Sequence, residues 1–173
     1  MLFETERLYL RPITQEDFDN WSLILSDAET MKHYPAPYDA SGVQRWIDWT
    51  LSNYEKYGFG LCALILKDTG EFIGDCGITM QNINGQTVPE IGYHLNKKFW
   101  RKGYASEAAR KCMEYAFEVI KFDKVYSYMT SSNAASYGVA VKNGMNFIEE
   151  YLEHGVPHRV YALSIQEWNA RNS

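Results

Sequence analysis

The residues best suited to chemistry lie in one stretch, from Glu90 to Ala108. It runs from an apolar, strand-like segment through a basic turn into a long helical pattern that begins after Gly103. The cations of the turn are Lys97, Lys98, Arg101 and Lys102. A helix start presents backbone N–H groups without helical partners at the positive end of the helix dipole, an arrangement that binds phosphate. We therefore predict an anion site here, where Gly103, Ala105 and Ser106 let a ligand approach the backbone.

The turn lacks the patterns of two common nucleotide sites. It contains no GxxxxGK[ST] sequence and no GxGxxG sequence followed by an acidic residue about 20 positions on. The alternative interpretation is a solvated basic loop in which Gly103 merely turns the chain. A P-loop or a dinucleotide fold is not indicated.

Two titratable side chains in this stretch could move a proton. Strand alternation places Glu90 on the same face as Gly92 and His94. Either side chain could serve as a general base. The alternatives are a carboxylate solvated at a strand end and a histidine that only packs.

The elements that must position these residues change in kind along the chain. Strands are predicted at 8–11, 61–66, 72–80, 88–95, 125–130, 147–152 and 159–163. Helices are predicted to start at Thr14, to run from a Ser41 cap to about Tyr57, to follow Gly103 as far as Ile120, and to span 134–143 before Gly144. A meander followed by alternation with helices predicts an α/β or α+β class with a mixed sheet.

Composition sets the broad class. The 173 residues are 46% hydrophobic, which suits one folded domain over residues 1–173. Seventeen Lys+Arg against 22 Asp+Glu leave a net charge of −5, which argues against a nucleic-acid partner. No apolar run reaches the roughly 20 residues that a membrane helix needs, so no membrane partner is expected. The charged start of the chain and its odd cysteine count predict a cytoplasmic location.

The cysteines are expected to be small core residues. They stand in separate segments, with no CxxC pair and no histidine at metal-ligand spacing: Cys62, Cys76 and Cys112. We therefore expect neither a disulfide framework, nor a metal site, nor a cysteine nucleophile.

Three segments resemble the GCN5-related N-acetyltransferase (GNAT) superfamily, and within it the group that acetylates the N-termini of ribosomal proteins. The sequence Trp-Arg-Lys-Gly-Tyr-Ala at 100–105 is similar to the acetyl-CoA loop pattern Gln/Arg-x-x-Gly-x-Gly/Ala, with Trp100 in the first place as in this subgroup. The stretch from Asn133 to Gly144 resembles the subgroup's Asn-x-x-Ser-x-x-Val-x-x-Lys-x-Gly pattern. Residues 5–12 resemble its usual opening, so the resemblance spans nearly the whole chain.

This resemblance implies a fold and a cosubstrate. The fold would be a mixed, mostly antiparallel sheet of about seven strands, splayed between the fourth and fifth, with about four helices. The cosubstrate would be acetyl-CoA, without a metal. The backbone of Tyr93, His94 and Leu95 would pair with the pantetheine arm, Asn133 would contact that arm, and the pyrophosphate would lie on Arg101, Lys102, Gly103, Tyr104, Ala105 and Ser106.

The resemblance also implies direct acetyl transfer to a primary amine. Glu90 would be the base, acting through a water, with His94 as the substitute candidate. Ser136 would protonate the CoA thiolate, with helix capping as its alternative role. Many superfamily members use a tyrosine one turn further along, where this chain has Ala140; Tyr137 or Tyr128 could compensate.

The acceptor is expected at two loops, 31–39 and 153–158, which carry tyrosines and histidines. A protein N-terminal α-amine is the first choice, because it is far more often neutral at pH 7 than a lysine amine. A small amine (polyamine, aminoglycoside or amino acid) and a non-catalytic acyl-CoA-binding module are the alternatives. The acids Glu149, Glu150 and Glu153 suit a cationic acceptor or a solvated face, and a homodimer is left open.

Overall fold

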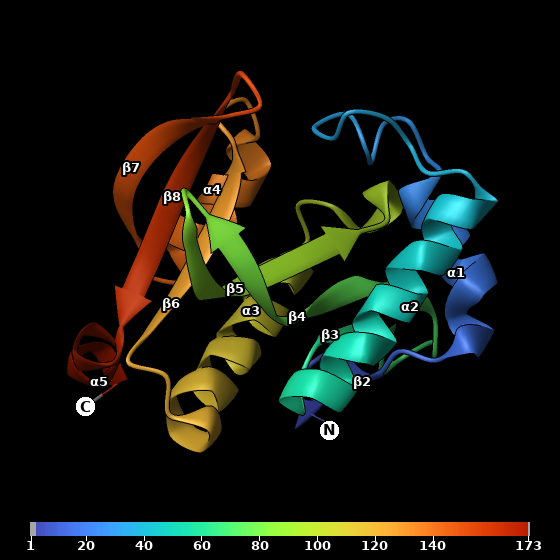
Figure 1. Cartoon of the computed structure of the whole chain (residues 1–173). Coiled ribbons are helices and arrows are strands. Elements are labelled where there is room, and N and C mark those ends of the chain that lie inside the picture. Colours follow the sequence, from blue (N-terminus) through green and yellow to red (C-terminus); the bar gives the residue numbers. More distant parts are fainter. Residues whose placement is uncertain (1–2, 173) are drawn as a thin grey trace.

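An eight-stranded mixed sheet forms the centre of the fold, in the order β1-β2-β3-β4-β5-β6-β8-β7. The computed structural model describes residues 3–172 (Figure 1). The strands are β1 Phe3–Glu4, β2 Leu8–Pro12, β3 Leu61–Leu66, β4 Phe72–Ile83, β5 Gln86–Leu95, β6 Lys124–Thr130, β7 Asn146–Glu153 and β8 Val156–Ser164. The predicted class is confirmed. The strand beyond the seven expected is the short β1, which pairs with β2.

Five α-helices surround the sheet, one more than the sequence predicts. They are α1 Phe18–Leu25, α2 Ala40–Tyr57, α3 Tyr104–Tyr115, α4 Ala134–Lys142 and α5 Ile165–Asn172. The unpredicted α5 has one buried residue, Trp168, which packs on Phe117 and is too little to make a periodic pattern. None of the helices among residues 3–172 is long and apolar enough to cross a membrane.

Two helix boundaries differ from the prediction. Helix α2 is capped by Asp39, whose Oδ1 accepts from the Gly42 backbone N–H at 2.7 Å. The predicted cap, Ser41, lies inside the helix and donates its hydroxyl to Asp39. Helix α3 ends at Tyr115 and continues as a π-helical turn, Ala116–Ile120, so the apolar stripe extends as predicted although the helix type changes.

The β4–β5 hairpin brings the central strands into register. Its two turn residues, Asn84 and Gly85, have φ of 47° and 81°, which suits a two-residue turn whose twist matches the strands. The strands therefore extend closer to the turn than the sequence predicts. From this turn the ladder runs back to the pair Gly74↔Leu95.

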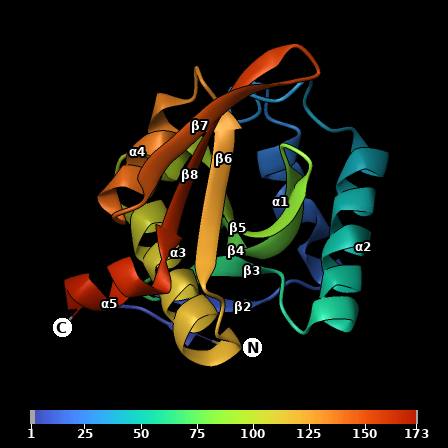
Figure 2. The same ribbon diagram turned by 60° about the vertical axis from the view of Figure 1, so that its left-hand side comes forward.

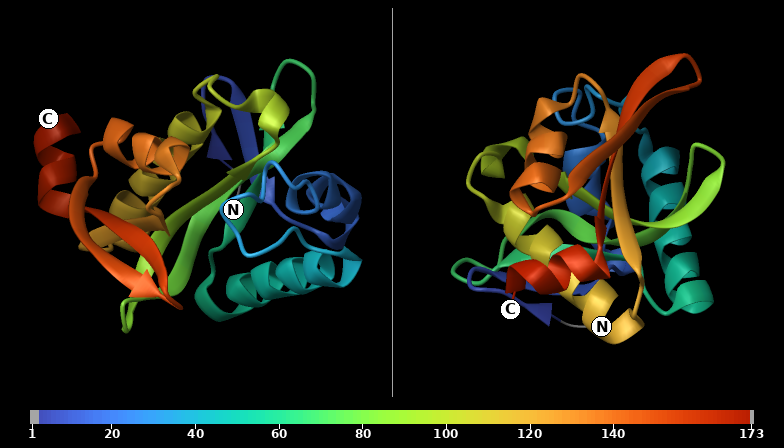
Figure 3. Two further views of the ribbon diagram at one scale, coloured as in Figure 1. Left: turned by 90° about the horizontal axis from the view of Figure 1, so that it is seen from above. Right: turned by 90° about the vertical axis from the view of Figure 1, so that its left-hand side faces the viewer.

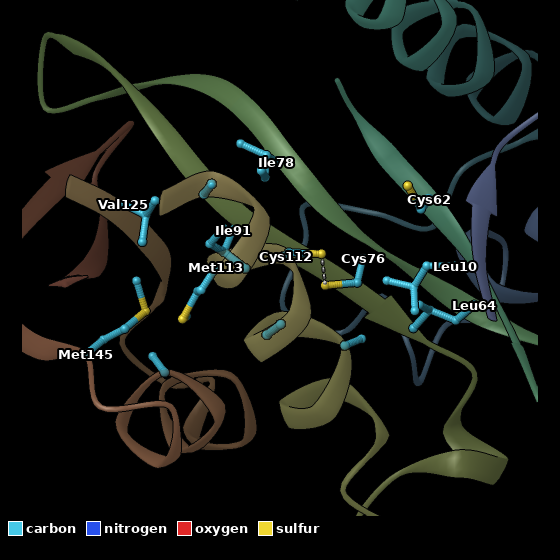
Figure 4. Close-up of a cluster of buried hydrophobic side chains, with 14 of the residues drawn as sticks. Leu10, Cys62, Leu64, Cys76, Ile78, Ile91, Cys112, Met113, Val125 and Met145 are labelled. Carbon is cyan, nitrogen blue, oxygen red and sulfur yellow. Dashed lines mark hydrogen bonds between the residues drawn. The ribbon is translucent and has the colours of Figure 1, made fainter. Parts of the chain in front are cut away.

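The helices cover the two faces of the sheet, α1 and α2 on one and α3 with α4 on the other (Figures 2 and 3). Each face has its own apolar cluster, one built on α3 and one on α1 and α2. Cys76 and Cys112 face each other in the first, with their Sγ atoms 3.7 Å apart (Figure 4). All three cysteines are free and buried, as predicted.

The sheet opens between β5 and β6. These two strands are parallel and share one bridge, Glu90↔Tyr126, beyond which they diverge (Figure 1). They are the fourth and fifth of the strands predicted from the sequence, so the splay lies where it is expected.

Candidate active site

A polar stripe crosses β4 and β5 on the face that α2 covers. The antiparallel register pairs Asp75 with His94 and Thr79 with Glu90, and Gly77 lies opposite Gly92 between them. Because alternate residues of a strand share a face, Glu90, Gly92 and His94 point to the same side, as predicted. Their cross-strand partners, which sequence reasoning did not identify, complete the stripe.

Glu90 lies at the point where β5 and β6 separate. Its side chain is 9% exposed, and Thr79 Oγ1 donates to Glu90 Oε2 at 2.9 Å. Burial raises the pKa of Glu90 to about 7, against the hydrogen bond from Thr79 and the charge of His94, which lower it. A Cβ on Gly92 would stand 3.0 Å from Glu90 Oε2, so the glycine makes room for the carboxylate. A carboxylate with this pKa is suited to exchange protons at neutral pH.

His94 is held at both ring nitrogens. Its Nδ1 lies 3.0 Å from Asp75 Oδ1 and its Nε2 lies 2.6 Å from the Tyr34 hydroxyl. The Trp46 ring meets the imidazole edge-on, with 5.5 Å between centroids. Burial alone would lower the pKa of His94, but the charge and hydrogen bond of Asp75, aided by Glu90, raise it overall.

The edge of β5 that faces β6 is open past Glu90. The Asn96 N–H donates to Ile73 O on β4 at 2.9 Å, so the backbone of His94 also faces β4. By alternation, the backbones of Tyr93 and Leu95 face the gap between β5 and β6, and no strand among the described residues pairs with them there. Leu95 O accepts from Trp100 Nε1 at 2.8 Å. Of the three residues predicted to pair with pantetheine, Tyr93 therefore presents its backbone N–H and C=O to the gap, Leu95 presents its N–H, and His94 contributes its side chain to the stripe.

Ser136 lies on the opposite side of β5 from Glu90. The Tyr93 hydroxyl donates to the Ser136 backbone carbonyl at 2.8 Å and lies 3.1 Å from Ser136 Oγ. Asn133 caps α4, because its Oδ1 accepts from the Ser136 N–H at 3.1 Å. The capping role weighed for Ser136 thus belongs to Asn133. Since Glu90 and Tyr93 point to opposite faces, the gap between β5 and β6 is the route by which both sides could reach one ligand.

The basic turn ends in a helix start with free amides. Arg101 and Gly103 have φ of 60° and 86°, and the first helical bond of α3 joins the Glu107 N–H to Gly103 O at 3.1 Å. The N–H groups of residues 104–106 therefore have no acceptor within the helix. This geometry is the one expected of the predicted anion site.

Arg7 fixes the shape of this turn, which the sequence did not reveal. Its Nη1 donates to Lys102 O at 2.9 Å, and its Nη2 lies 2.6 Å from Glu107 Oε2. Its guanidinium also stacks over Tyr104 at 4.4 Å. Arg7 therefore forms an ion pair with Glu107 in the first turn of α3, so the carboxylate of Glu107 is bonded to Arg7 and not to the free amides.

The segment between α1 and α2 spans the open end of the sheet. Lys97 Nζ, just past β5, lies 2.8 Å from Asp27 Oδ1, and His33 Nδ1 lies 3.3 Å from Ser132 Oγ beyond β6. Tyr34, in this segment, reaches the stripe through His94. This predicted acceptor loop is thus adjacent to Glu90.

The second acceptor loop lies on the β7–β8 side. The His158 ring is 5.9 Å from Tyr128 and 6.0 Å from Tyr151 between centroids, and its Nε2 lies 3.6 Å from Glu153 Oε2. Burial raises the pKa of Tyr128, and the nearby charges of Glu90 and Glu153 raise it further. These side chains extend from Glu90 toward the β7–β8 hairpin.

Glu149 and Glu150, two of the acids that the sequence suggested for a cationic acceptor, are hydrogen-bonded to neighbouring side chains. Asn84 Nδ2 donates to both oxygens of Glu149, at 3.2 and 3.1 Å. Glu150 accepts from Ser131 at 2.7 Å and from Arg159 at 3.2 Å. Among residues 3–172 no cluster of three or more His, Cys, Asp or Glu is arranged to hold a metal ion.

The amino-acid sequence of the chain matches a known protein family. Residues 7–146 match the family described as the acetyltransferase (GNAT) domain. The chain is 37% identical over 158 residues to the uncharacterized protein YkkB of Bacillus subtilis, covering 91% of this chain and 92% of that protein. It is 32% identical over 151 residues to the uncharacterized N-acetyltransferase p20 of Bacillus licheniformis, covering 86% and 83%.

Solved structures share the fold. A GNAT-family acetyltransferase from Bacillus anthracis has a TM-score of 0.83 at 25% identity, covering 96% of this chain and all of that one. RimL, a ribosomal L7/L12 alpha-N-protein acetyltransferase solved in complex with coenzyme A, has a TM-score of 0.78 at 17% identity, covering 96% and 99%. At 17% identity, the similarity to RimL shows the fold alone.

Proposed function

The chain belongs to the acetyltransferase (GNAT) family and is an N-acetyltransferase, and from this premise we propose that it transfers the acetyl group of acetyl-CoA directly to a protein or peptide N-terminal α-amine. The observation that carries the proposal is Glu90, a buried carboxylate with a pKa of about 7 at the opening of the sheet. We also propose that residues 1–173 form one domain, because the sheet continues through all eight strands. A cytoplasmic location and a homodimer stay predictions.

Two features of the chain suit acetyl-CoA. The free amides of residues 104–106, beside the basic turn, suit the pyrophosphate. The backbone groups of Tyr93 and Leu95 suit the amide-bearing pantetheine arm, which would add to β5 like a further strand. Asn133 would contact that arm through the part of its side chain that does not cap α4. When bound, acetyl-CoA supplies an activated thioester, and the chain's own residues orient it and move the protons.

Glu90 would accept the proton of the incoming ammonium, directly or through a water. With a pKa of about 7, about half of the Glu90 side chains are ionised at neutral pH. At pH 7 about a tenth of an α-amine of pKa roughly 7.9 is neutral, against about 0.04% of a lysine amine of pKa roughly 10.4. A base of this strength is matched to the first acceptor, and this match favours the α-amine.

Ser136 would supply the proton that the departing thiolate needs. Its Oγ lies 3.1 Å from the Tyr93 hydroxyl, and burial raises the pKa of Tyr93, so that hydroxyl stays protonated. Tyr93 would hold Ser136 Oγ in place, and Ser136 would regain its proton from solvent after CoA leaves. Ser136 and Tyr93 would together take the role that the family resemblance gives to a tyrosine at the position of Ala140 here.

A small cationic amine is the second candidate acceptor. A cation would be attracted by the ring faces and the carboxylate that lie together here, those of Tyr128, His158, Tyr151 and Glu153. The match between the pKa of Glu90 and that of an α-amine favours the protein N-terminus instead. Family membership favours catalysis over the alternative of a non-catalytic acyl-CoA-binding module.

The test is release of free CoA thiol from acetyl-CoA with a panel of acceptors. The panel contains peptides with free N-termini, the same peptides blocked at the N-terminus, polyamines, aminoglycosides and amino acids. We expect turnover with free peptides and background hydrolysis with blocked ones. Turnover with polyamines alone would establish the second candidate, and no turnover with any amine would overturn the proposal.

A further inference from the structure

A chain of three side chains, Tyr34–His94–Asp75, lies beside the candidate base and has no part in the function proposed so far. Asp75 is fully buried, at 0% exposure, and the His94 side chain is 10% exposed. Asp75 Oδ1 bonds to His94, and its Oδ2 is buried without a hydrogen-bond partner among the described residues. A buried carboxyl with one oxygen left unpartnered is stabilised by a cation beside it. His94 is the residue in position to be that cation.

The hydrogen bonds on both sides of the ring fix what His94 can do. Nδ1 faces a carboxylate, and Nε2 faces a tyrosine hydroxyl at 2.6 Å. A tyrosine hydroxyl is protonated at neutral pH, and the pKa of Tyr34 is raised further above its ordinary value, so this hydroxyl can accept from an imidazolium Nε2–H. With both nitrogens engaged, His94 has no free nitrogen to take a proton from an acceptor amine. It is therefore suited to hold a charge and unsuited to be the base.

That charge acts on Glu90. Both side chains project from the same face of β5, and the residue between them on that face, Gly92, has no side chain to separate them. The Glu90 carboxylate leans over Gly92, since a Cβ there would stand 3.0 and 3.4 Å from its two oxygens. The charge of His94 opposes the effect of burial on Glu90.

Within residues 3–172, the other groups that face this pair do not supply a second cation. From β4 come Asp75, which disfavours ionisation of Glu90, and the neutral Thr79. The segment between α1 and α2 contributes Tyr34, β6 contributes Tyr128, β5 itself contributes Tyr93 from its other face, and α2 contributes the uncharged Trp46 ring.

We propose that His94 is a positioning residue whose positive charge, anchored by Asp75 and oriented by Tyr34, keeps Glu90 ionised for proton abstraction. This inference rests on the proposed function of Glu90. It also links the base to the segment that spans the open end of the sheet. Lys97 ties that segment to the end of β5 through Asp27, and His33 ties it to Ser132. Displacement of this segment would remove Tyr34 from His94 and weaken the charge.

The experiment is the pH dependence of kcat/KM for wild type and His94→Gln, with acetyl-CoA and the best amine of the panel. Glutamine retains a donor for Asp75 and removes the charge. We expect the acid limb to move up by about one pH unit, as one charge about 13 Å away, four strand residues at about 3.3 Å each, implies through an effective dielectric near 20. At pH 6 kcat/KM should fall about tenfold, and above pH 9 it should approach wild type. Tyr34→Phe should move the limb less in the same direction, and Lys124→Gln, which removes an exposed cation at the start of β6, should leave the limb in place.

Two kinetic outcomes overturn the inference. Nearly complete loss of activity at every pH, with no recovery above pH 9, would make His94 the base. A partial loss that is equal at every pH, with the acid limb unmoved, would make His94 a packing residue. A second measurement does not depend on turnover: carbon-13 NMR titration of the Glu90 carboxyl, assigned with Glu90→Gln, in wild type and His94→Gln. The Glu90 pKa should be higher in the variant even if no acceptor is found; an equal pKa in two folded proteins would refute the charge coupling, whereas absence of transfer alone would refute only the proposed function.

Discussion

Replacement of Glu90 by glutamine should abolish most activity and stabilise the protein. Glutamine has nearly the same shape and can still accept the hydrogen bond of Thr79, which is 2.9 Å long. It cannot take a proton from an amine. We therefore expect kcat to fall by about a hundredfold or more, within the usual range for a general base, with little change in acetyl-CoA affinity.

The stability gain follows from the raised pKa. Glu90 has an ordinary pKa of 4.5 and a folded-state pKa of about 7, so the folded protein binds its proton more tightly than the unfolded chain does. The ionised carboxylate therefore costs stability that increases as the pH rises from 4.5 toward 7. The two pKa values correspond to about 1 kcal/mol at pH 5 and about 3 kcal/mol at pH 8, which the glutamine removes.

Urea denaturation followed by tryptophan fluorescence at pH 5 and pH 8 measures this difference. The free energy of unfolding of Glu90→Gln should exceed that of wild type at pH 8, by up to about 3 kcal/mol, and by much less at pH 5. Glu107→Gln is the matched control of opposite sign. Burial would raise the pKa of Glu107, but its bonds to Thr5 and Arg7 lower it overall, so its contribution is present above the ordinary pKa and lost in acid. That variant should be less stable than wild type at pH 8 and nearer to it at lower pH.

A Glu90→Gln protein with the same stability difference from wild type at both pH values would refute the reasoning. It would mean that the Glu90 carboxyl titrates at its ordinary pKa and is solvated. Wild-type turnover in a folded variant would separately exclude Glu90 as the base. The two readouts thus test the burial of the carboxyl and its chemical role independently.

Three further changes test the surroundings of the site. Gly92→Ala places a Cβ 3.0 Å from Glu90 Oε2, so kcat should fall about tenfold while the KM for acetyl-CoA changes little, as steady-state kinetics would show. Gly103→Val and Gly103→Asn both add a Cβ that would stand 3.4 Å from Arg7 Nη2 at the start of α3, and they should weaken acetyl-CoA binding in calorimetry. Because φ is 86° there and asparagine tolerates this region better, the valine variant should also unfold at lower temperature; unchanged affinity in the asparagine variant would remove the turn from the cofactor site. Arg7→Gln loses its 2.6 Å ion pair with Glu107, which should lower stability by about 1 kcal/mol in urea denaturation and acetyl-CoA affinity in calorimetry; an unaltered affinity would show that Arg7 does not shape the turn for binding.

Local features of the fold could be predicted from the sequence because their causes are local. The turn between the predicted strands 72–80 and 88–95, the apolar stripe of α3 and the stop at Gly144 depend on backbone freedom and periodicity, which neighbouring residues determine. The three buried cysteines follow from spacing and composition. Errors occurred where two local solutions compete, as at the start of α2, where Asp39 caps in place of Ser41.

The sequence by itself determined that Glu90, Gly92 and His94 share a strand face and that a helix with free amides follows Gly103. Only the tertiary structure decided what stands opposite them. The β4–β5 register brings Asp75 and Thr79 next to this face. Tyr34 contacts His94 although it lies 60 positions earlier in the sequence. The pKa of a buried group depends on burial and on neighbouring charges in space, whereas the order of residues carries only their spacing along the chain.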